Sequence, residues 1–337
     1  MIETELPFVS ILIPARNEEL HIGSCLESLA KSTYPKEKLE IIIADGLSID
    51  NTRNQIALFS DKFPALHVIE NTDKNQAAAI NLAANLAREE SRYLIRIDAH
   101  STYPNHFIQT CIEAAESQNA GLVVYVNKPT PGTPFQSVVA TVLSSPLAIG
   151  NAAYRIGKSS GFVDHGQHGC FRRNLFDELG GYDPTMSPNE DGELSHRILK
   201  YGAPIYLDTR LTMYYVPRNS LRRLFRQYLR WGIARCRNHW KHKHLPKFRQ
   251  IAPPGLILYE IFALLCLILW GTPIVFIPIG FYFLLIIAIS FQISLQLTSF
   301  RGLISLLIFP MIHHAWGAGF LLNFLCGGRL IASKISD

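Results

Sequence analysis

The stretch Tyr93-Leu-Ile-Arg-Ile-Asp-Ala-His100 is a mostly apolar run, typical of a strand, that leads directly into an acid and an imidazole. In an open α/β sheet, ligands bind just beyond the carboxyl ends of the strands. Asp98 and His100 would then offer an oxygen and a nitrogen ligand on that rim, where a divalent cation can bridge them to a diphosphate. The alternative is a strand followed by an ordinary polar turn, because Asp and Ser are common turn residues. The neighbouring stretches favour the first interpretation.

Strand and helix patterns alternate through the first part of the chain. Near-continuous apolar runs at residues 8–13 and 39–44 are typical of parallel strands that are buried on both faces. Further strands are predicted at 67–70, 93–97 and 121–126, and helices at 20–29, 51–61, 77–87 and 105–117. This alternation indicates βαβ units and a mostly parallel sheet. We expect the polar residues after the strand ends to share one rim, where a nucleotide would bind; they are Arg16 to Glu18, Asp45 and Asp98.

A second group of polar residues begins a helix further along the chain. Residues 129–161 are rich in Pro, Gly and Ser, which predicts a crossing loop with a helix near 135–149. Helices are predicted next at 174–179 and 191–201, and Asn189-Glu-Asp-Gly-Glu193 opens the second of them. Acids in the first turn of a helix suit its dipole. Asp191 is therefore either a reactive carboxylate or only a helix-start residue.

Residues 219–240 predict a helix with two contrasting faces. The apolar face carries Leu221, Leu224, Phe225, Tyr228 and Trp231, and the opposite face carries Arg222, Arg223, Arg226, Arg230 and Arg237. Such a helix can lie in the plane of the lipid headgroups, with its arginines toward phosphate. It can equally pack on the domain as a surface helix.

The composition changes sharply along the chain. The mean hydropathy of +0.13 conceals a segment, residues 254–326, in which only Glu260 and Arg301 are ionised at neutral pH. Residues 254–270 and 273–293 are apolar enough for membrane helices, whereas 303–326 is broken by His313-His314 and glycines and is either a third span or a re-entrant segment. We expect a catalytic domain at 1–217, a basic interfacial region at 218–250 and a membrane region at 251–337 with two to three helices.

The charge distribution indicates a membrane rather than a nucleic acid. The net charge is +5, and Lys or Arg occupies about one position in three from Arg218 to Arg249, directly before the first apolar segment. Anionic lipid and the positive-inside bias explain this placement, so we expect a multi-pass protein of the inner (plasma) membrane with its catalytic part in the cytoplasm. The six cysteines have no regular spacing, which predicts neither a disulfide framework nor a zinc site.

Taken together, five motifs resemble those of family 2 glycosyltransferases, and among these the membrane-bound, succinoglycan-type exopolysaccharide glucosyltransferases. The resemblance covers about residues 7–240. Each motif is weak alone, but all five stand in the expected order. They are Ile13-Pro-Ala-Arg-Asn-Glu18, Ala44-Asp-Gly-Leu-Ser-Ile-Asp-Asn-Thr52, Asp98-Ala-His100, Asn189-Glu-Asp191 and Gln227-Tyr-Leu-Arg-Trp231.

The resemblance implies a GT-A fold, which is Rossmann-like with a mostly parallel sheet, followed by C-terminal transmembrane helices. It implies that the nucleotide is bound by Pro14, Arg16, Glu18, Asp45 and Asp98, with Asp45 at the base. It also implies that Asp191 is the catalytic base of an inverting transfer, and that Gln227, Arg230 and Trp231 serve the diphosphate and acceptor sites. Without the resemblance, Asp45-Gly46 is a common turn pair and Trp231 suits a membrane boundary.

One position departs from the family pattern, because His100 stands where the family has a second acid. Histidine is a borderline ligand that suits Mn²⁺ better than Mg²⁺, which prefers oxygen. We therefore expect a divalent metal, Mn²⁺ or Mg²⁺, on Asp98 and His100.

The predicted activity is the transfer of a hexose, namely glucose from UDP-glucose, to a lipid-linked saccharide acceptor in exopolysaccharide synthesis. The expected partners are these two substrates and membrane lipids, and no nucleic acid is expected to bind. A processive polysaccharide synthase is the nearest alternative, although it would need more spans to form a channel. A non-catalytic nucleotide-binding membrane scaffold is the alternative from a different class. A nucleotidyltransferase would need a glycine-rich, lysine-bearing loop, and residues 14–20 contain neither Gly nor Lys.

Overall fold

The computed structural model describes residues 6–150 and 152–332. The chain divides into two compact units. The first unit contains the residues up to Lys128 together with Ala153–Tyr215, and the second contains Pro129–Ala152 and the residues from Val216 onward. The crossing segment near 129–152 thus joins the C-terminal helices rather than the sheet.

The parallel half of the first unit's sheet contains four strands in the order β3-β2-β1-β4. These are β1 (Phe8–Ala15), β2 (Leu39–Asp45), β3 (Leu66–Glu70) and β4 (Ser91–Arg96), and every pair among them is parallel. In the register, Ala15 lies opposite Asp45. The carboxyl ends of β1 and β2 therefore reach the same edge, as the sequence predicted.

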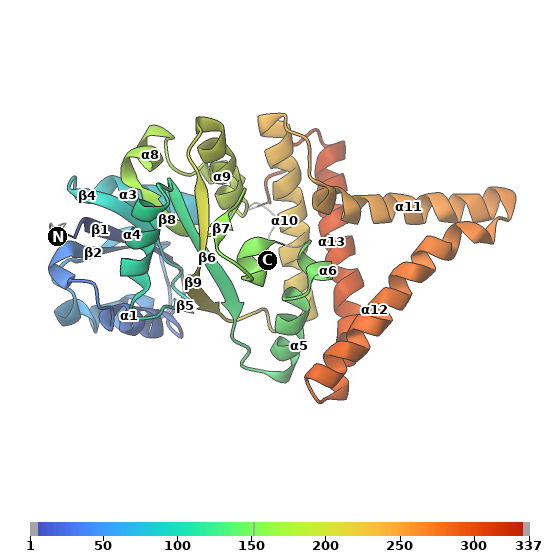
Figure 1. Cartoon of the computed structure of the whole chain (residues 1–337), viewed down its shortest axis with the longest axis horizontal. Coiled ribbons are helices and arrows are strands. Elements are labelled where there is room, and N and C mark those ends of the chain that lie inside the picture. The colour runs from blue at the N-terminus through green and yellow to red at the C-terminus, as the bar shows by residue number, and fades with distance from the viewer. Residues whose placement is uncertain (1–5, 151, 333–337) are drawn as a thin grey trace. The chain divides into compact units, whose positions relative to one another are not determined.

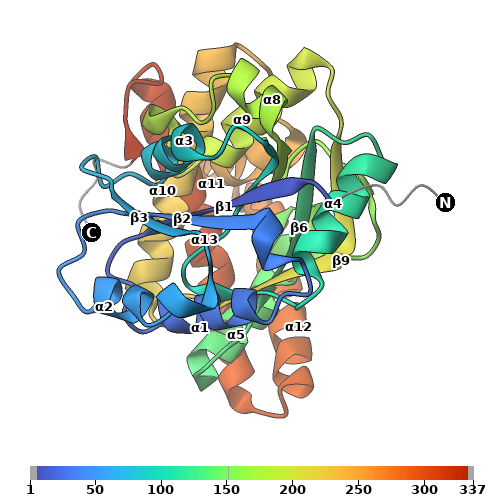
Figure 2. The same cartoon turned by 90° about the vertical axis from the view of Figure 1, so that its left-hand side faces the viewer.

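Helices cover both faces of this parallel half. They are α1 (Ile22–Ala30), α2 (Thr52–Ala57), α3 (Gln76–Leu86) and α4 (Phe107–Ser117). Figure 2 shows α3 on one side of β1 and β2, with α1 and α2 on the other. Asn75 caps α3, because its side-chain oxygen accepts hydrogen bonds from the amides of Ala77 and Ala78 at 2.8 and 3.2 Å.

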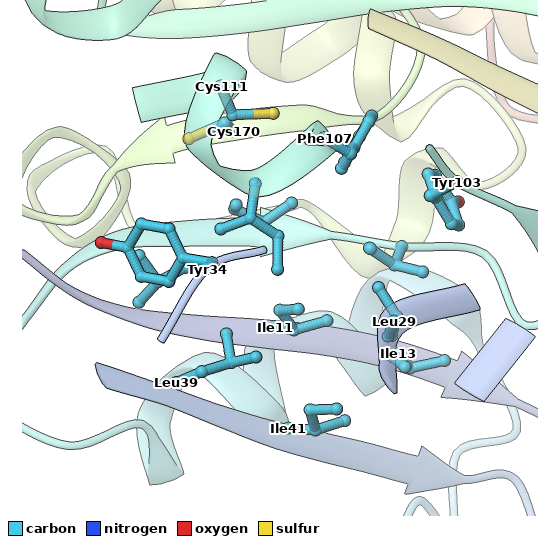
Figure 3. Close-up of a cluster of buried hydrophobic side chains, with 14 of the residues drawn as sticks. Ile11, Ile13, Leu29, Tyr34, Leu39, Ile41, Tyr103, Phe107, Cys111 and Cys170 are labelled. Atoms are coloured by element: carbon cyan, nitrogen blue, oxygen red, sulfur yellow. The ribbon is translucent and has the colours of Figure 1, made fainter. Parts of the chain in front are cut away.

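The core lies between this sheet and helices α1 and α4. Figure 3 shows Ile11 and Ile13 of β1 on the same side as Ile41 of β2, close to Leu29 of α1. Successive strand residues point to opposite faces, so alternate isoleucines of one strand enter the same cluster. Burying each such side chain stabilises the fold by roughly 1.5–3 kcal/mol.

Beyond β4 the sheet becomes antiparallel. The order continues β4-β8-β6-β9-β5, and β7 pairs with β9; the strands are β5 (Ser101–Thr102), β6 (Leu122–Pro129), β7 (Gly161–Phe162), β8 (Gly169–Arg172) and β9 (Ile205–Tyr215). The sheet is therefore mixed, and the parallel arrangement is confined to its first four strands. Gly169 is required where β8 meets β6, because a Cβ there would lie 2.7 Å from the carbonyl oxygen of Val123.

Two longer connections complete the first unit. They contain α7 (Ala153–Ile156), α8 (Arg173–Glu178), the 3₁₀ turn η3 (Pro184–Met186) and α9 (Glu190–Tyr201). Glu190 and Asp191 lie in the first turn of α9, as predicted. The helix ends at Gly202, whose φ of 94° is a left-handed value that suits glycine.

The second unit is helical. It contains α5 (Pro134–Leu143), α6 (Pro146–Ile149), α10 (Leu221–His242), α11 (Phe248–Trp270), α12 (Ile277–Gln296) and α13 (Ser305–Leu325). Short turns η4 (Pro273–Phe276) and η5 (Phe300–Ile304) precede α12 and α13. Three of the described helical segments are long and apolar enough to cross a membrane. Figure 1 shows α11 and α12 diverging from the turn that joins them.

Helices α10 and α13 run side by side at very short distance. A Cβ on Gly232 would lie 2.0 Å from the carbonyl oxygen of Trp316, and one on Gly319 would lie 2.1 Å from that of Leu229. Leu224 and Tyr228 of α10 are buried in one cluster with apolar residues of α5, α12 and α13. Most of the apolar face of α10 therefore packs against protein, whereas Phe225 stays 42% exposed.

The paired histidines of α13 have partners in three other helices of this unit. His313 lies with Nδ1 2.8 Å from the Tyr282 hydroxyl and Nε2 3.0 Å from the Leu147 carbonyl. His314 Nε2 is 2.8 Å from a carboxylate oxygen of Glu260. Polar groups are costly in an apolar region unless they are paired. These contacts connect α6, α11 and α12 to α13.

Candidate functional site

The loops after β1 and β2 are locked together by side chains of both. The Asn17 amide donates to Ser48 Oγ at 2.9 Å, the Ile49 amide donates to Asn17 Oδ1 at 3.0 Å, and the Glu18 amide donates to Thr52 Oγ1 at 2.7 Å. Asn17 has a φ of 55°, a left-handed value that asparagine tolerates better than most residues. The first two motifs, which were predicted to bind the nucleotide, thus form one continuous rim.

Asp45, predicted to contact the base, is fully buried at this rim. Its carboxylate accepts hydrogen bonds from Arg53 Nε at 2.6 Å and from Ser48 Oγ at 2.5 Å. Arg16 is exposed beside it, and its methylene groups lie 3.1–3.3 Å from the position that a Cβ on Gly46 would occupy. Pro14 lies opposite Ala44 in the strand register. The structure thus gathers Pro14, Arg16 and Asp45 at two neighbouring strand ends.

Asp98 follows β4 and is nearly buried. His168 Nε2 lies 3.1 Å from its Oδ2, and Gln76 donates to its Oδ1 at 3.2 Å. Burial disfavours the charged carboxylate, but the attraction and hydrogen bond of His168, with further attraction from His100 and Arg96, outweigh burial and hold the pKa of Asp98 well below its usual range. The Asp98 carboxylate is therefore ionised at neutral pH, as a metal ligand would need to be.

His100 is the more exposed partner in this group. Its Nε2 lies 4.0 Å from Asp98 Oδ2, and its Nδ1 lies 3.3 Å from a carboxylate oxygen of Glu18. Glu18 belongs to the loop after β1, so this contact joins the first motif to the third. The structure brings Glu18, Asp98 and His100 together.

Arg96 connects Asp98 to the start of α9. It lies in β4, and its side chain is only 1% exposed. One guanidinium nitrogen donates to Asp191 Oδ1 at 2.8 Å, while the other donates to Glu190 Oε1 at 3.3 Å and lies 4.0 Å from Asp98 Oδ1. The candidate metal ligand and the candidate catalytic base, 93 positions apart in sequence (191 minus 98), therefore meet at one buried cation.

The donor set on this rim fits a divalent metal in an open site. No group of three or more His, Cys, Asp or Glu side chains within 6–150 and 152–332 is arranged to hold a metal alone. Mg²⁺ and similar ions commonly use one or two protein ligands and complete their shell with water and phosphate oxygens. Asp98 and His100 offer that pair.

The remaining predicted site residues belong to the second unit. Gln227, Arg230 and Trp231 lie on α10, and each is partly buried. The Trp231 ring is tilted against that of Tyr228, with ring centres 5.1 Å apart. Their assignment to the diphosphate and acceptor stays a prediction.

Sequence reasoning missed three residues of the site: Arg96, His168 and Tyr182. Arg96 had a visible signal, because a charged residue in an otherwise apolar strand is rarely buried without a partner. His168 lies in Gly166-Gln-His-Gly169 and has a φ of 55°, which indicates an unusual backbone but no particular partner. Tyr182 donates to Asp191 Oδ1 at 2.8 Å, and nothing in its spacing from Asp191 predicts that contact.

Comparison with known proteins gives consistent matches. Residues 10–180 match the family model described as Glycosyl transferase family 2. The chain is 33% identical over 322 residues to the succinoglycan biosynthesis protein ExoA of Rhizobium meliloti (strain 1021), covering 96% of each chain. It is 27% identical over 237 residues to a dolichyl N-acetyl-alpha-D-glucosaminyl phosphate 3-beta-D-2,3-diacetamido-2,3-dideoxy-beta-D-glucuronosyltransferase of Methanococcus voltae, covering 68% of this chain and 73% of that one.

Solved structures match the fold. The mannosyltransferase PcManGT from Pyrobaculum calidifontis, in complex with GDP-Man and Mn²⁺, aligns with a TM-score of 0.63 at 18% identity over 96% of this chain and 88% of that one. Residues 1–349 of S. aureus TarS, in complex with UDP, align with a TM-score of 0.51 at 15% identity over 77% and 72%. The predicted GT-A fold is thereby confirmed.

Proposed function

The chain belongs to glycosyl transferase family 2, and we propose that it is an inverting, membrane-attached hexosyltransferase that uses a nucleotide sugar, UDP-glucose, in exopolysaccharide synthesis. The acceptor we propose is a lipid-linked saccharide. The observation that carries the proposal is the meeting of Asp98 and Asp191 at Arg96, because a transfer of this kind needs a ligand for the leaving diphosphate beside a base for the attacking hydroxyl.

The nucleotide is assigned to the rim formed by the loops after β1 and β2. Pro14, Arg16 and Glu18 would contact the nucleoside, and Asp45 would contact the base. Asp45 is rigidly oriented for such a role because Arg53 and Ser48 hold its carboxylate. Gln227, Arg230 and Trp231 are assigned to the diphosphate and acceptor by their motif alone. An arginine suits that task because its planar guanidinium binds phosphate oxygens in pairs.

A divalent metal, Mn²⁺ or Mg²⁺, would be held by Asp98 and His100. When bound, it supplies a positive charge that stabilises the departing diphosphate. The complex of PcManGT with GDP-Man and Mn²⁺ supports this assignment by analogy. His168 and Gln76 hold the carboxylate of Asp98 in place from the protein side.

Asp191 would act on the acceptor. It takes the proton of the attacking hydroxyl while the hydroxyl oxygen forms a bond to the anomeric carbon. The bond between that carbon and the diphosphate oxygen breaks, and its electron pair leaves with the nucleoside diphosphate. Because attack and departure occur on opposite faces, the anomeric configuration is inverted, and an α-linked donor gives a β-linked product.

The second unit is assigned to membrane attachment. We propose a catalytic domain at 1–217, a basic interfacial region at 218–250 and a membrane region at 251–337, in the inner (plasma) membrane with the catalytic domain in the cytoplasm. The length and apolarity of α11 and α12 support this assignment, and so does the basic tract before them. Attachment would hold the active site at the level of a lipid-linked acceptor.

The test is donor turnover by the full-length, detergent-purified protein. A panel of nucleotide sugars is supplied with a membrane lipid extract, in Mn²⁺, Mg²⁺ or EDTA, to wild type, Asp98→Asn and Asp191→Asn. We expect metal-dependent release of UDP from UDP-glucose, reduced by about 10²–10⁴-fold in Asp191→Asn because the base is lost. Asp61→Asn, an exposed acid in the 3₁₀ turn after α2, is the matched control.

Each other outcome removes a defined part of the proposal. Turnover that persists in EDTA removes the metal and keeps the transferase. Turnover of a different nucleotide sugar replaces the donor. If neither the wild type nor Asp191→Asn turns over any donor, a non-catalytic nucleotide-binding scaffold is favoured instead.

A further inference from the structure

Two adjacent carboxylates, those of Glu190 and Asp191, face the same buried guanidinium. If both were ionised together with Asp98, three negative charges would surround Arg96 in a region from which water is largely excluded. Burying unbalanced charge is costly. The two carboxylates therefore have reason to differ in protonation.

Their surroundings are unequal. Asp191 Oδ1 accepts two hydrogen bonds at 2.8 Å, one from Arg96 and one from the Tyr182 hydroxyl. The Glu190 carboxylate accepts a longer hydrogen bond from Arg96, at 3.3 Å, and its Oε2 is buried without a hydrogen-bond partner among the described residues. Burial, opposed by Arg96 and reinforced by the neighbouring Asp191, raises the pKa of Glu190.

Tyr182 is itself held in position. The side chain of Asn81 in α3 accepts a hydrogen bond from the Tyr182 amide at 2.8 Å and donates one to its carbonyl at 2.7 Å. The Arg96 guanidinium carbon lies 5.2 Å from the centre of the Tyr182 ring. The two side chains that donate to Asp191 thus extend from a strand and from a loop that Asn81 anchors.

Both hydrogen bonds to Asp191 end on the same oxygen. Within the part of the chain that the structure describes, Oδ2 has no hydrogen-bond partner, and the Asp191 side chain is 13% exposed against 4% for Glu190. One oxygen is therefore fixed and the other is left to receive a proton.

We propose that Arg96 and Tyr182 are positioning residues that hold Asp191 by Oδ1 so that Oδ2 accepts the acceptor proton, and that Glu190 serves as a neutral carboxylic acid. This inference rests on the proposed function. It extends that function by separating two adjacent acids into a base and a neutral partner, a separation that enzymes achieve through unequal environments. It also gives Arg96 a role in the chemical step rather than in donor binding.

The kinetic test compares Arg96→Met, Arg96→Lys and Tyr182→Phe with Arg92→Met, an exposed arginine on the same strand. With the donor that wild type turns over, we expect Arg96→Met to lower kcat by about 10²-fold with donor KM within about 3-fold, because small displacements of a catalytic group cost that much. Arg96→Lys should restore part of the loss and Tyr182→Phe should lose less than Arg96→Met. A raised KM with unchanged kcat would overturn the positioning role.

A second comparison tests the charge of Glu190 in two ways, by kcat and, independently of turnover, by the melting temperature. Gln resembles a neutral Glu, so Glu190→Gln should lose less than about 10-fold in kcat, whereas Asp191→Asn should lose about 10²–10⁴-fold. The melting temperature of Glu190→Gln should also stay within about 4 °C of wild type. A larger fall in melting temperature, or equal kinetic losses in both variants, would show that Glu190 is ionised and would overturn its neutral role.

The two experiments separate this inference from the proposed function. If the wild type turns over a donor and the kcat of Arg96→Met equals that of Arg92→Met, the inference is refuted and the proposed function stands. A wild type without turnover refutes the proposed function and with it the positioning role, and the melting temperature of Glu190→Gln then still decides the charge of Glu190.

Discussion

At the scale of the residue, Asp98 depends on side chains that come from distant parts of the chain. His168 precedes β8, Gln76 begins α3 and Arg96 lies in β4. His100 stands where the family motif has its second acid, and the His100 side chain contacts Glu18. The carboxylate of Asp98 is therefore oriented by groups that lie outside the Asp98-Ala-His100 motif.

His168→Phe tests how much Asp98 relies on its imidazole partner. Phe keeps an aromatic ring over Tyr125, which now stacks on His168 with 6.3 Å between centres, but it removes the 3.1 Å contact. We expect the free energy of unfolding to fall by about 1–3 kcal/mol, the cost of a buried polar group without its partner. Thermal melting curves measure this loss of stability, and His106→Phe, at an exposed histidine before α4, is the control. Equal melting temperatures would contradict the dependence.

At the scale of the element, glycines decide how closely the helices of the second unit approach. Gly232 of α10 and Gly319 of α13 each lie against a carbonyl oxygen of the other helix. Gly317 is similar, because a Cβ there would lie 2.6 Å from the carbonyl oxygen of Pro253 in α11. Small residues at such contacts let helix backbones pack closely, in membranes as in soluble proteins.

Gly232→Ala tests this packing. The added methyl group would overlap the Trp316 carbonyl, so α10 and α13 must separate, and we expect loss of folded protein or a clearly lower melting temperature in detergent. Gly280→Ala in α12 is the control, because a Cβ there meets nothing within 4 Å and alanine favours a helix. Size-exclusion profiles and melting curves provide the measurement. Similar behaviour of both variants would show that the approach is looser.

At the scale of the whole molecule, the second unit indicates which helices cross the bilayer. Contacts between α10 and α13 progress in the same direction along both helices, from Leu229 with Gly319 to Ile233 with Asn323. Because α10 carries exposed arginines, which are costly in hydrocarbon, we expect it to stay near the headgroups. The three candidate spans differ in how much of their most apolar part is buried inside the protein. The share is 44% for the segment that contains α13, 17% for α11 and 11% for the segment that contains α12. We therefore expect α11 and α12 to cross and α13 to remain beside α10.

Cys326 reports the outcome, because it is the exposed cysteine at the end of α13 and the other five are buried. In oriented membrane vesicles, a membrane-impermeant maleimide should label Cys326 from the same side as Ile49→Cys in the first unit, which is 92% exposed. Ile274→Cys, at the turn between α11 and α12, should label from the opposite side. Both engineered cysteines are placed in a Cys326→Ser background. If Cys326 is labelled from the same side as Ile274→Cys, α13 crosses the bilayer.

The sequence by itself determined the family, the parallel βαβ half, the polar strand ends and the apolar C-terminal segments. These follow from local patterns, namely apolar runs, helical spacing and ordered motifs, that need no knowledge of distant contacts. It did not determine β8 or β9, which are held by partners far away in the chain. Short strands that join a sheet antiparallel leave a weak local signal, because pairing and burial decide them.

Only the tertiary structure decided how the acids of the site are arranged. The sheet places β4 beside β8, and the loop before α9 comes close to both, so Arg96, His168 and Tyr182 reach Asp98 and Asp191. The contacting residues are 9 to 95 positions apart in sequence, and such separations leave no periodic signal. The same holds for α13, whose composition suits a membrane span while its glycines fit it against α10. Composition states what a segment tolerates, but packing determines where it lies, because close contact depends on shape and partner rather than on hydrophobicity alone.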